Sequence, residues 1–213
     1  MGENGVMNPL LFRIIHLNNL EYVLKNGMFT RGHINADPNY INIGDSTLIT
    51  QRQAHPVGIV PPGGSLGDYV PFYFGPLSPM LLNIKTGYRG IVKRPQTDIV
   101  YICCRFANIT KSCKEWCFTD GHAKDRLTAF YNNKDQLEAV DWNMVGQRYW
   151  RANEEDIDRM RRKQAEFLVK NQVPVECISG IIVYDSTTEG IVKKLITELR
   201  LSIPVIVKSE YYY

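Results

Sequence analysis

The 213-residue sequence lacks any apolar run that approaches the ~20 residues a membrane-spanning helix needs. It also lacks a GxGxxG dinucleotide-binding fingerprint, an internal repeat and a low-complexity tract. Its opening residues, MGENG, carry neither the basic nor the apolar region of a secretion signal. These absences argue against a membrane protein, a repeat array and a secreted protein, and they predict a cytoplasmic location.

The sequence also lacks a large excess of positive or negative charge. Its 25 Lys and Arg residues are nearly balanced by 22 Asp and Glu residues, and the net charge is +3. Any contact with nucleic acid must therefore come from local clusters of basic residues. Residues 85–94 hold four basic residues and no acid, and residues 148–163 hold a second basic group diluted by acids. Each cluster fits a solvated face as well as a nucleic-acid interface.

Cysteine is infrequent, and five cysteines, an odd number, argue against a disulfide framework. The adjacent pair Cys103 and Cys104 lies in an apolar run and is interpreted as small core residues. Cys113, Cys117 and His122 have no evident fourth ligand, and their spacing matches no usual zinc pattern. We therefore predict no metal site.

Scattered strand patterns and segregated helix patterns predict one α+β domain over residues 1–213. The polar segment 30–68 is expected to be a functional loop or to contain short irregular helices. Alternation and apolar runs place the strands. The strands are expected at residues 11–15, 70–74, 99–106, 181–184 and, as a shorter possibility, 204–207.

Helices are predicted from their caps and periodicity. The first should begin after His16, with Asn18 or Asn19 as its cap, and should end at Gly27. A second is expected at residues 153–163, where Asn153 precedes acids in the first turn and arginines in the last. A third is expected at residues 189–199, with apolar residues repeating along one side. Its buried side should comprise Ile191, Val192, Leu195, Ile196 and Leu199.

The most informative segment is VPFYFGPLSPML at residues 70–81, which follows the proline- and glycine-rich loop 60–69. A strand that stops against such turns can hold side chains and backbone close to a ligand, although an ordinary core strand has the same pattern. The segment resembles the DarT family, bacterial toxins that transfer ADP-ribose from NAD onto bases of single-stranded DNA. The resemblance extends over about residues 10–207.

This resemblance implies an NAD site built from several segments. The motif IIHLNNLEYVLKNG at residues 14–27 is similar to the opening motif of the family, which implies that His16, and with it Asn18, holds NAD. Arg52 occupies the place of the arginine that contacts the NAD phosphates, a role that suits its planar fork. From the local pattern alone, a surface arginine is the better interpretation.

Tyr73 and Phe74 should alternate between the two sides of a strand. The resemblance favours Tyr73 as the ring that meets nicotinamide, with Met80 lining the side of the target base. Phe74 is expected to pack in the core.

Glu166 stands in KQAEFLV, between a basic helix pattern and a short apolar run. From periodicity alone it is an acid at a helix end or a strand start. The resemblance places it at the family's essential glutamate. A carboxylate there would stabilise an oxocarbenium-like ribose and accept a proton from a base nitrogen.

The turn TDGHA at residues 119–123 is similar to an Asp-Gly-x-Ala element of the family, which implies that His122 reaches the reaction centre or the target base. Arginines interleaved with aromatics follow it, a pattern that suits unpaired nucleic acid as well as a loop anchored to the core. The expected DNA contacts, besides Met80, are Arg148, Tyr149, Trp150, Arg151 and Arg162.

The family resemblance also implies the ADP-ribosyltransferase fold, a split pair of mostly antiparallel sheets around an NAD cleft with flanking helices. NAD would be the co-substrate, thymine in single-stranded DNA the acceptor, and a DarG-like macrodomain antitoxin the protein partner. Two alternatives remain: a related transferase that acts on guanine in DNA or on RNA, and a non-catalytic module that binds single-stranded nucleic acid. Glu166 argues against the second alternative.

Overall fold

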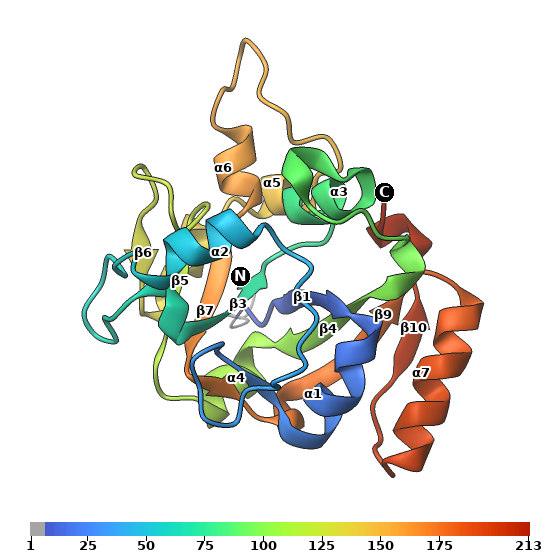
Figure 1. Cartoon of the computed structure of the whole chain (residues 1–213). Coiled ribbons are helices and arrows are strands. Elements are labelled where there is room, and N and C mark those ends of the chain that lie inside the picture. The colour runs from blue at the N-terminus through green and yellow to red at the C-terminus, as the bar shows by residue number, and fades with distance from the viewer. Residues whose placement is uncertain (1–6) are drawn as a thin grey trace, which may run out of the picture.

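The computed structural model describes residues 7–213, and its main element is one eight-stranded sheet (Figure 1). The strands lie in the order β10-β9-β4-β1-β3-β7-β5-β6, and neighbours are antiparallel except for β9 and β10. The short strands β2 and β8 pair separately. The bounds are Leu10–His16 (β1), Met28–Phe29 (β2), Tyr69–Tyr73 (β3), Ile99–Arg105 (β4), Trp116–Thr119 (β5), Phe130–Tyr131 (β6), Glu166–Lys170 (β7), Gln172–Val173 (β8), Ile178–Val183 (β9) and Val205–Val207 (β10).

The helices flank this sheet, and α2, α3, α5 and α6 gather above it in Figure 1, while α1 and α4 lie below. Residues of α3 pack in the core on one face of the sheet, whereas residues of α1, α4 and α7 pack in the core on the other face. The helices are Leu20–Asn26 (α1), Ser46–Gln53 (α2), Pro79–Thr86 (α3), Phe106–Ser112 (α4), Trp142–Gly146 (α5), Arg159–Lys163 (α6) and Ser186–Glu198 (α7).

The central strands are apolar on both faces because both faces are covered. In β1, Leu11 and Ile15 pack in the core together with residues of α1 and α4. Phe12 and Ile14 pack in the core on the other face, together with residues of α3. Successive side chains of a strand point to opposite faces, so a doubly covered strand reads as a continuous apolar run. The same logic buries Cys103 and Cys104 on opposite faces of β4, as the sequence predicted.

The sheet is split between β1 and β3. These two strands pair in register at a single position, Phe12 with Tyr73. On either side of that junction the pairing is continuous, with β1 matched to β4 and β3 matched to β7 over their whole lengths. The two halves therefore meet at one point, which agrees with the split, mostly antiparallel α+β fold expected from the sequence.

All five expected strands are confirmed to within three residues at each end, but the helix expected at 153–163 is wrong in its first half. Only Arg159–Lys163 is helical. The Asn153 side chain accepts a hydrogen bond from the Asp156 N–H and closes a turn, and the Asp156 carboxylate pairs with Arg162. Asp156 and Asp158 thus form ion pairs with arginines of α6 and do not fill the first turn of a longer helix.

The last long helix, α7, is confirmed but begins three residues earlier than expected. Its cap is the Asp185 side chain, which accepts a hydrogen bond from the Thr188 N–H at 2.8 Å. Val192 and Ile196 are buried as expected, whereas Ile191 is 53% exposed, so its place on the buried side was wrong.

The first helix ends at Gly27 as predicted, where φ is 92° and an added Cβ would lie 2.7 Å from the Val173 carbonyl oxygen. Asn19 occupies the cap position, but its side chain makes no cap. It instead exchanges two hydrogen bonds with the backbone of Ile41 and so anchors the long loop that follows α1. That loop contains α2, in line with the expectation of short helices over 30–68.

Two further observations bear on the class of protein. Among residues 7–213, no helix is both long and apolar enough to cross a membrane. Over the same residues, no three His, Cys, Asp or Glu side chains come together in a way that would hold a metal ion.

Candidate active site

Glu166 lies at the start of β7, directly opposite Tyr73 and beside the junction of the two half-sheets. Its carboxylate is 4% exposed and forms a two-pronged pair with Arg52. The Arg52 Nη1 lies 2.9 Å from Oε1 and Nη2 lies 2.7 Å from Oε2. The backbone N–H of Ala123 donates a third hydrogen bond, to Oε1, at 3.0 Å. The carboxylate is therefore held in one orientation by three donors.

These donors keep Glu166 ionised. Burial by itself disfavours the charged carboxylate, but the charge and hydrogen bonds of Arg52 and the hydrogen bond from the Ala123 N–H outweigh it. The net effect holds the pKa of Glu166 below its ordinary value. A buried carboxylate that stays charged at neutral pH is suited to stabilise a developing cation.

His122 is half-buried next to this carboxylate and is favoured in its neutral form. Burial lowers the pKa of His122 most strongly, and the positive charge of Arg52 adds to that effect, although Glu166 opposes it. Tyr73 stays protonated for a related reason, because burial and then the charge of Glu166 raise the pKa of its phenol. The site thus combines one anion, one cation and two neutral groups.

The loop that carries His122 is fastened to β7 by Thr119. The Thr119 hydroxyl accepts a hydrogen bond from the Glu166 N–H at 3.0 Å and donates one to the Gly121 carbonyl at 2.6 Å. The Lys124 ammonium also bonds the Gln51 side chain of α2. Strand β5, this loop and α2 are therefore tied to one another around Glu166.

Arg161 of α6 holds the same loop in place. Its guanidinium contacts Asp120 at 2.9 Å and Asp158 through two bonds of 2.7 Å, and its carbonyl accepts the His122 N–H at 2.9 Å. The loop can pass this close only because residue 121 is glycine, since a Cβ there would lie 2.4 Å from the Arg161 Nη1. Arg161 is a supporting residue that the sequence did not single out.

Lys163 holds the neighbouring backbone together. Its ammonium is buried and donates to the carbonyl oxygens of Pro76 and Val145, at 2.8 and 2.6 Å. Burial lowers the pKa of Lys163 to about 8. The turn after β3 and the end of α5 are thereby fixed beside the strand that begins at Glu166.

His16 and Asn18 lie apart from this group. His16 ends β1, four residues beyond the junction residue Phe12, or roughly 13 Å along the strand. Its Nδ1 accepts the Asn18 N–H at 3.1 Å, and its Nε2 lies 4.0 Å from Asp98. Burial, followed by the charge of Arg94, lowers the pKa of His16. The predicted NAD contacts therefore do not lie in one cluster. Only a long ligand would contact both His16 and the group around Glu166.

Phe74 packs in the core, as the sequence predicted. Phe74 is buried and packs edge-to-face against Phe118, Trp142 and Phe167. Met80 is half-buried at the start of α3, close to the loop that leads into α2.

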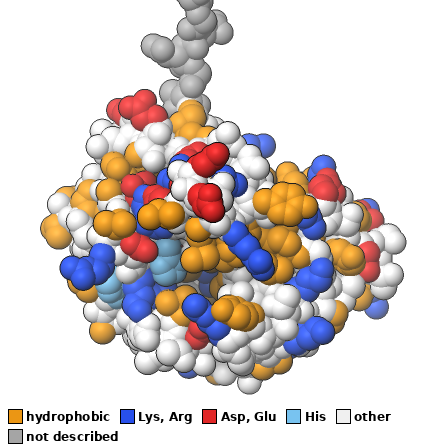
Figure 2. All heavy atoms as spheres, turned by 90° about the horizontal axis from the view of Figure 1, so that it is seen from above, with side chains coloured by type: hydrophobic (Ala, Val, Ile, Leu, Met, Phe, Trp, Pro, Cys, Tyr) orange, Lys and Arg blue, Asp and Glu red, His pale blue; other side chains and the backbone are white. Residues whose placement is uncertain are grey.

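The predicted DNA contacts fall into two groups. Arg148, Tyr149 and Arg151 are exposed and lie on the loop between α5 and α6. Trp150 is 7% exposed, and Arg162 is paired with Asp141 and Asp156. In Figure 2, basic and hydrophobic side chains alternate around a hollow on the face that carries α2, α3 and α6. The exposed group suits a nucleic acid better than the paired one.

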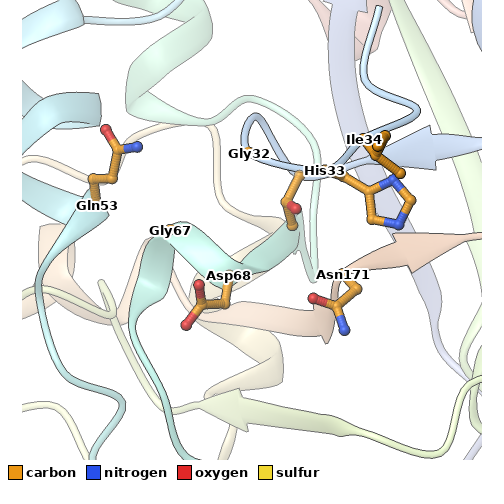
Figure 3. Close-up of a pocket in the computed structure, with 8 residues that line it drawn as sticks. Gly32, His33, Ile34, Gln53, Gly67, Asp68 and Asn171 are labelled. Carbon is orange, nitrogen blue, oxygen red and sulfur yellow. The ribbon is translucent and has the colours of Figure 1, made fainter.

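A separate pocket of about 310 Å³ lies at the other end of the β3–β7 pair (Figure 3). Gln53 of α2, Asp68 before β3 and Asn171 after β7 border it, together with His33 of the long loop. None of the site residues predicted from the sequence lines this pocket.

Comparison with known proteins identifies the family of this chain. Residues 12–213 match the family described as "ssDNA thymidine ADP-ribosyltransferase, DarT". A DNA ADP-ribosyl transferase of Escherichia coli O127:H6 is 35% identical over 210 residues, which cover 97% of this chain and 96% of the relative. One from Thermus aquaticus is 33% identical over 221 residues, which cover 100% of this chain and 94% of the relative.

The solved structures lead to the same class. The Thermus sp. 2.9 DarT in complex with ADP-ribosylated ssDNA matches with a TM-score of 0.86 and 28% identity, over 96% of each chain. The complex of that protein with NAD+ matches with a TM-score of 0.79 and 28% identity, over 96% of this chain and 98% of the other. The fold is therefore that of a DNA ADP-ribosyltransferase. The chain belongs to the DarT family, which confirms the resemblance seen in the sequence.

Proposed function

We propose that this protein transfers ADP-ribose from NAD to thymine in single-stranded DNA, with Glu166, Arg52, His122 and Tyr73 forming the reaction centre. The single observation that carries the proposal is the buried, two-pronged pair between Arg52 and Glu166 at the junction of the half-sheets. Such a pair places an oriented anion in a low-dielectric site, where it interacts strongly with a cation.

In this proposal the bond between the ribose C1′ and the nicotinamide nitrogen breaks, and its electron pair leaves with nicotinamide. The ribose becomes oxocarbenium-like, and the ionised Glu166 stabilises that charge. A ring nitrogen of thymine then supplies the electron pair of the new bond to C1′. Its proton passes to the Glu166 carboxylate and from there to solvent.

The neighbouring groups have supporting roles. Arg52 orients the carboxylate with the two ends of its fork, and its remaining N–H groups and charge attract the NAD phosphates. Tyr73, protonated and opposite Glu166, offers its ring to nicotinamide. His122, neutral and beside Glu166, contacts the target base or assists its deprotonation. Because NAD is a dinucleotide, its far end is proposed to reach His16 and Asn18.

DNA is proposed to approach over α3 and the loop between α5 and α6, where Met80, Arg148, Tyr149 and Arg151 are accessible. Trp150 and Arg162 belong to the same segment, but their burial and ion pairs favour indirect support of the DNA path. We also propose a cytoplasmic location, where NAD and DNA meet, and a macrodomain antitoxin. The latter rests on the family resemblance.

The experiment that tests this proposal is incubation of the protein with labelled NAD and one single-stranded oligonucleotide at a time. The oligonucleotides are DNA or RNA and differ from one another only in the identity of one base. Label on thymine-containing DNA alone is the expected result. Label on guanine or on RNA would favour the related transferase instead. DNA binding without any label would favour the non-catalytic module.

A further inference from the structure

Two thiols that have no part in the proposed reaction approach each other where α4 meets the short 3₁₀ turn Val175–Cys177. Cys113 directly follows the last residue of α4, and Cys177 is the last residue of the turn, which leads into β9. Cα atoms of α4 lie within 8 Å of Cα atoms of this turn. All five cysteines of the chain are free thiols. In Figure 1, α4 lies below the sheet, whereas α2, which carries Arg52, lies above it.

Each of the two thiols contacts the backbone of the segment that carries the other. The Cys113 Sγ lies 3.7 Å from the carbonyl oxygen of Gln172, in the strand β8 that leads to Cys177. The Cys177 Sγ lies 3.8 Å from the carbonyl oxygen of Asn108, in the helix that leads to Cys113. The two side chains therefore cross between the same two stretches of backbone, and their sulfur atoms are neighbours.

The two thiols are also joined by a hydrogen bond. The Cys113 S–H donates to the Cys177 sulfur, and this bond, aided by one from Ser112, holds the pKa of Cys177 below its ordinary value although burial opposes it. The same hydrogen bond, followed by burial, raises the pKa of Cys113. Cys177 is therefore the thiol of the pair that ionises more readily, and the thiolate is the form that attacks a disulfide.

Exposure separates the roles of the cysteines further. Cys113 is partly exposed, whereas Cys177 is 0% exposed, so a reagent in solution reaches Cys113 first. Cys104 lies in the same core cluster, but it is 0% exposed and burial raises its pKa well above the ordinary value. Cys103 and Cys117 pack in other clusters. The pair of an accessible thiol and a buried thiolate suits a two-step oxidation.

We propose that Cys113 and Cys177 form a thiol oxidation site that closes reversibly into a disulfide. The Cys113 thiolate attacks one sulfur of a low-molecular-weight disulfide, whose other sulfur leaves as a thiolate, and a mixed disulfide forms on Cys113. The Cys177 thiolate then attacks the Cys113 sulfur and expels the second low-molecular-weight thiolate. The two protons of the protein thiols end on the two released thiols. The protein loses two electrons and the low-molecular-weight disulfide gains them.

The disulfide links the two ends of segment 113–177, which carries both His122 and Glu166. Closing so long a segment restricts the unfolded chain, whereas the folded chain already holds the two sulfurs together. The oxidised protein should therefore resist unfolding, and its Tm should rise by roughly 5–15 °C. The proposal is independent of the proposed transfer reaction, because neither NAD nor DNA takes part.

Treatment of the purified protein with oxidised glutathione, without NAD or DNA, tests the site. The protein is then unfolded, its remaining thiols are alkylated, and its peptides are analysed by mass spectrometry without reduction. The expected product is a Cys113–Cys177 disulfide, with Cys103, Cys104 and Cys117 alkylated. Melting curves should show the higher Tm after oxidation, and dithiothreitol should reverse both changes.

Variants separate the two steps. Cys177→Ser should accumulate the mixed disulfide on Cys113, because no second thiolate is available to displace it, and Cys113→Ser should form neither product. Cys103→Ala, on the opposite face of β4, is the control and should form the disulfide like wild type. Circular dichroism before oxidation shows whether each variant is folded. A disulfide to Cys104, a stable mixed disulfide on the wild-type protein, or a Tm that does not rise on oxidation would overturn the proposal.

Discussion

Glu166 shows how one side chain acquires its chemistry from its partners. A carboxylate on a side chain that is only 4% exposed would ordinarily resist ionisation, yet Arg52 and the Ala123 N–H keep it charged. These neighbours act by fixing the charge and the orientation of the Glu166 carboxylate. Two predictions belong to this scale.

Replacing Glu166 by Gln keeps the shape of the side chain and removes its charge. Because the oxocarbenium-like ribose loses its anion, transfer to DNA should fall on the order of 10²–10³-fold, while NAD still binds. Single-turnover rates with labelled NAD and calorimetric NAD titration provide the two measurements. Glu138→Gln, at an exposed acid, should retain wild-type rates. A Glu166→Gln rate near wild type would remove Glu166 from the mechanism.

Replacing Arg52 by Ala should weaken NAD binding far more than DNA binding, by roughly 1.5–3 kcal/mol. It should also raise the pKa of Glu166, because the carboxylate loses its cation and remains buried. Below that raised pKa the carboxylate is protonated, so the acid limb of the rate–pH profile should move to higher pH. Calorimetry and a pH series of single-turnover rates check both effects. An unchanged NAD affinity together with an unmoved acid limb would contradict the assignment.

At the scale of elements, α6 and the loop after β5 form one supporting unit. Arg161 joins them through Asp120 and Asp158, and its carbonyl accepts the N–H of the residue that faces Glu166. The orientation of the Ala123 N–H, which bonds the carboxylate, therefore depends on a helix that itself bears none of the reacting groups proposed here.

Arg161→Ala should accordingly lower kcat about 10²-fold, because small displacements of oriented groups have large effects on rate. The NAD affinity should change little, since Arg161 does not contact Arg52 or His16. Steady-state kinetics and NAD titration separate the two, and Arg161→Lys should recover only part of the rate because Lys cannot form the two-pronged pair with Asp158. Arg200→Ala, at an exposed arginine, serves as the control. Equal losses in kcat and in NAD affinity would indicate a general folding defect.

At the scale of the whole molecule, the net charge of +3 offers little overall attraction for DNA. Association must depend on the exposed arginines of one face, where basic and hydrophobic side chains surround the hollow in Figure 2. Binding should therefore be sensitive to salt and restricted to unpaired strands, because the target base must leave a stack to reach the ribose.

Charge reversal at Arg148 and Arg151 should reduce DNA modification and flatten its salt dependence. Loss of two phosphate contacts should decrease the slope of log K against log salt by about 1.4 for a single strand. Binding titrations across a salt series measure this slope, and duplex DNA should be a poor substrate throughout. Charge reversal at Lys194 and Arg200, which lie in α7 and just beyond it, should leave the slope unchanged. Equal rates on single- and double-stranded DNA would contradict the stacking argument.

The sequence was sufficient where the physical signal is local. The apolar runs at β1 and β4 predict buried strands because both faces of those strands are covered, and Gly27 predicts a helix end because only glycine fits there without strain. The resemblance to a family supplied Arg52 and Glu166 as candidates. Local pattern by itself left both as ordinary surface or helix-end residues.

The tertiary structure decided what depends on partners distant in the chain. Arg52 and Glu166 are separated by 114 positions, and their pairing exists only because α2 folds over the junction of the half-sheets. The acids after Asn153 look like the first turn of a helix, yet Asp156 and Asp158 instead pair with arginines of α6. Which arginines remain free for DNA is therefore a consequence of folding, because an ion pair depends on distance in space and not on order along the chain.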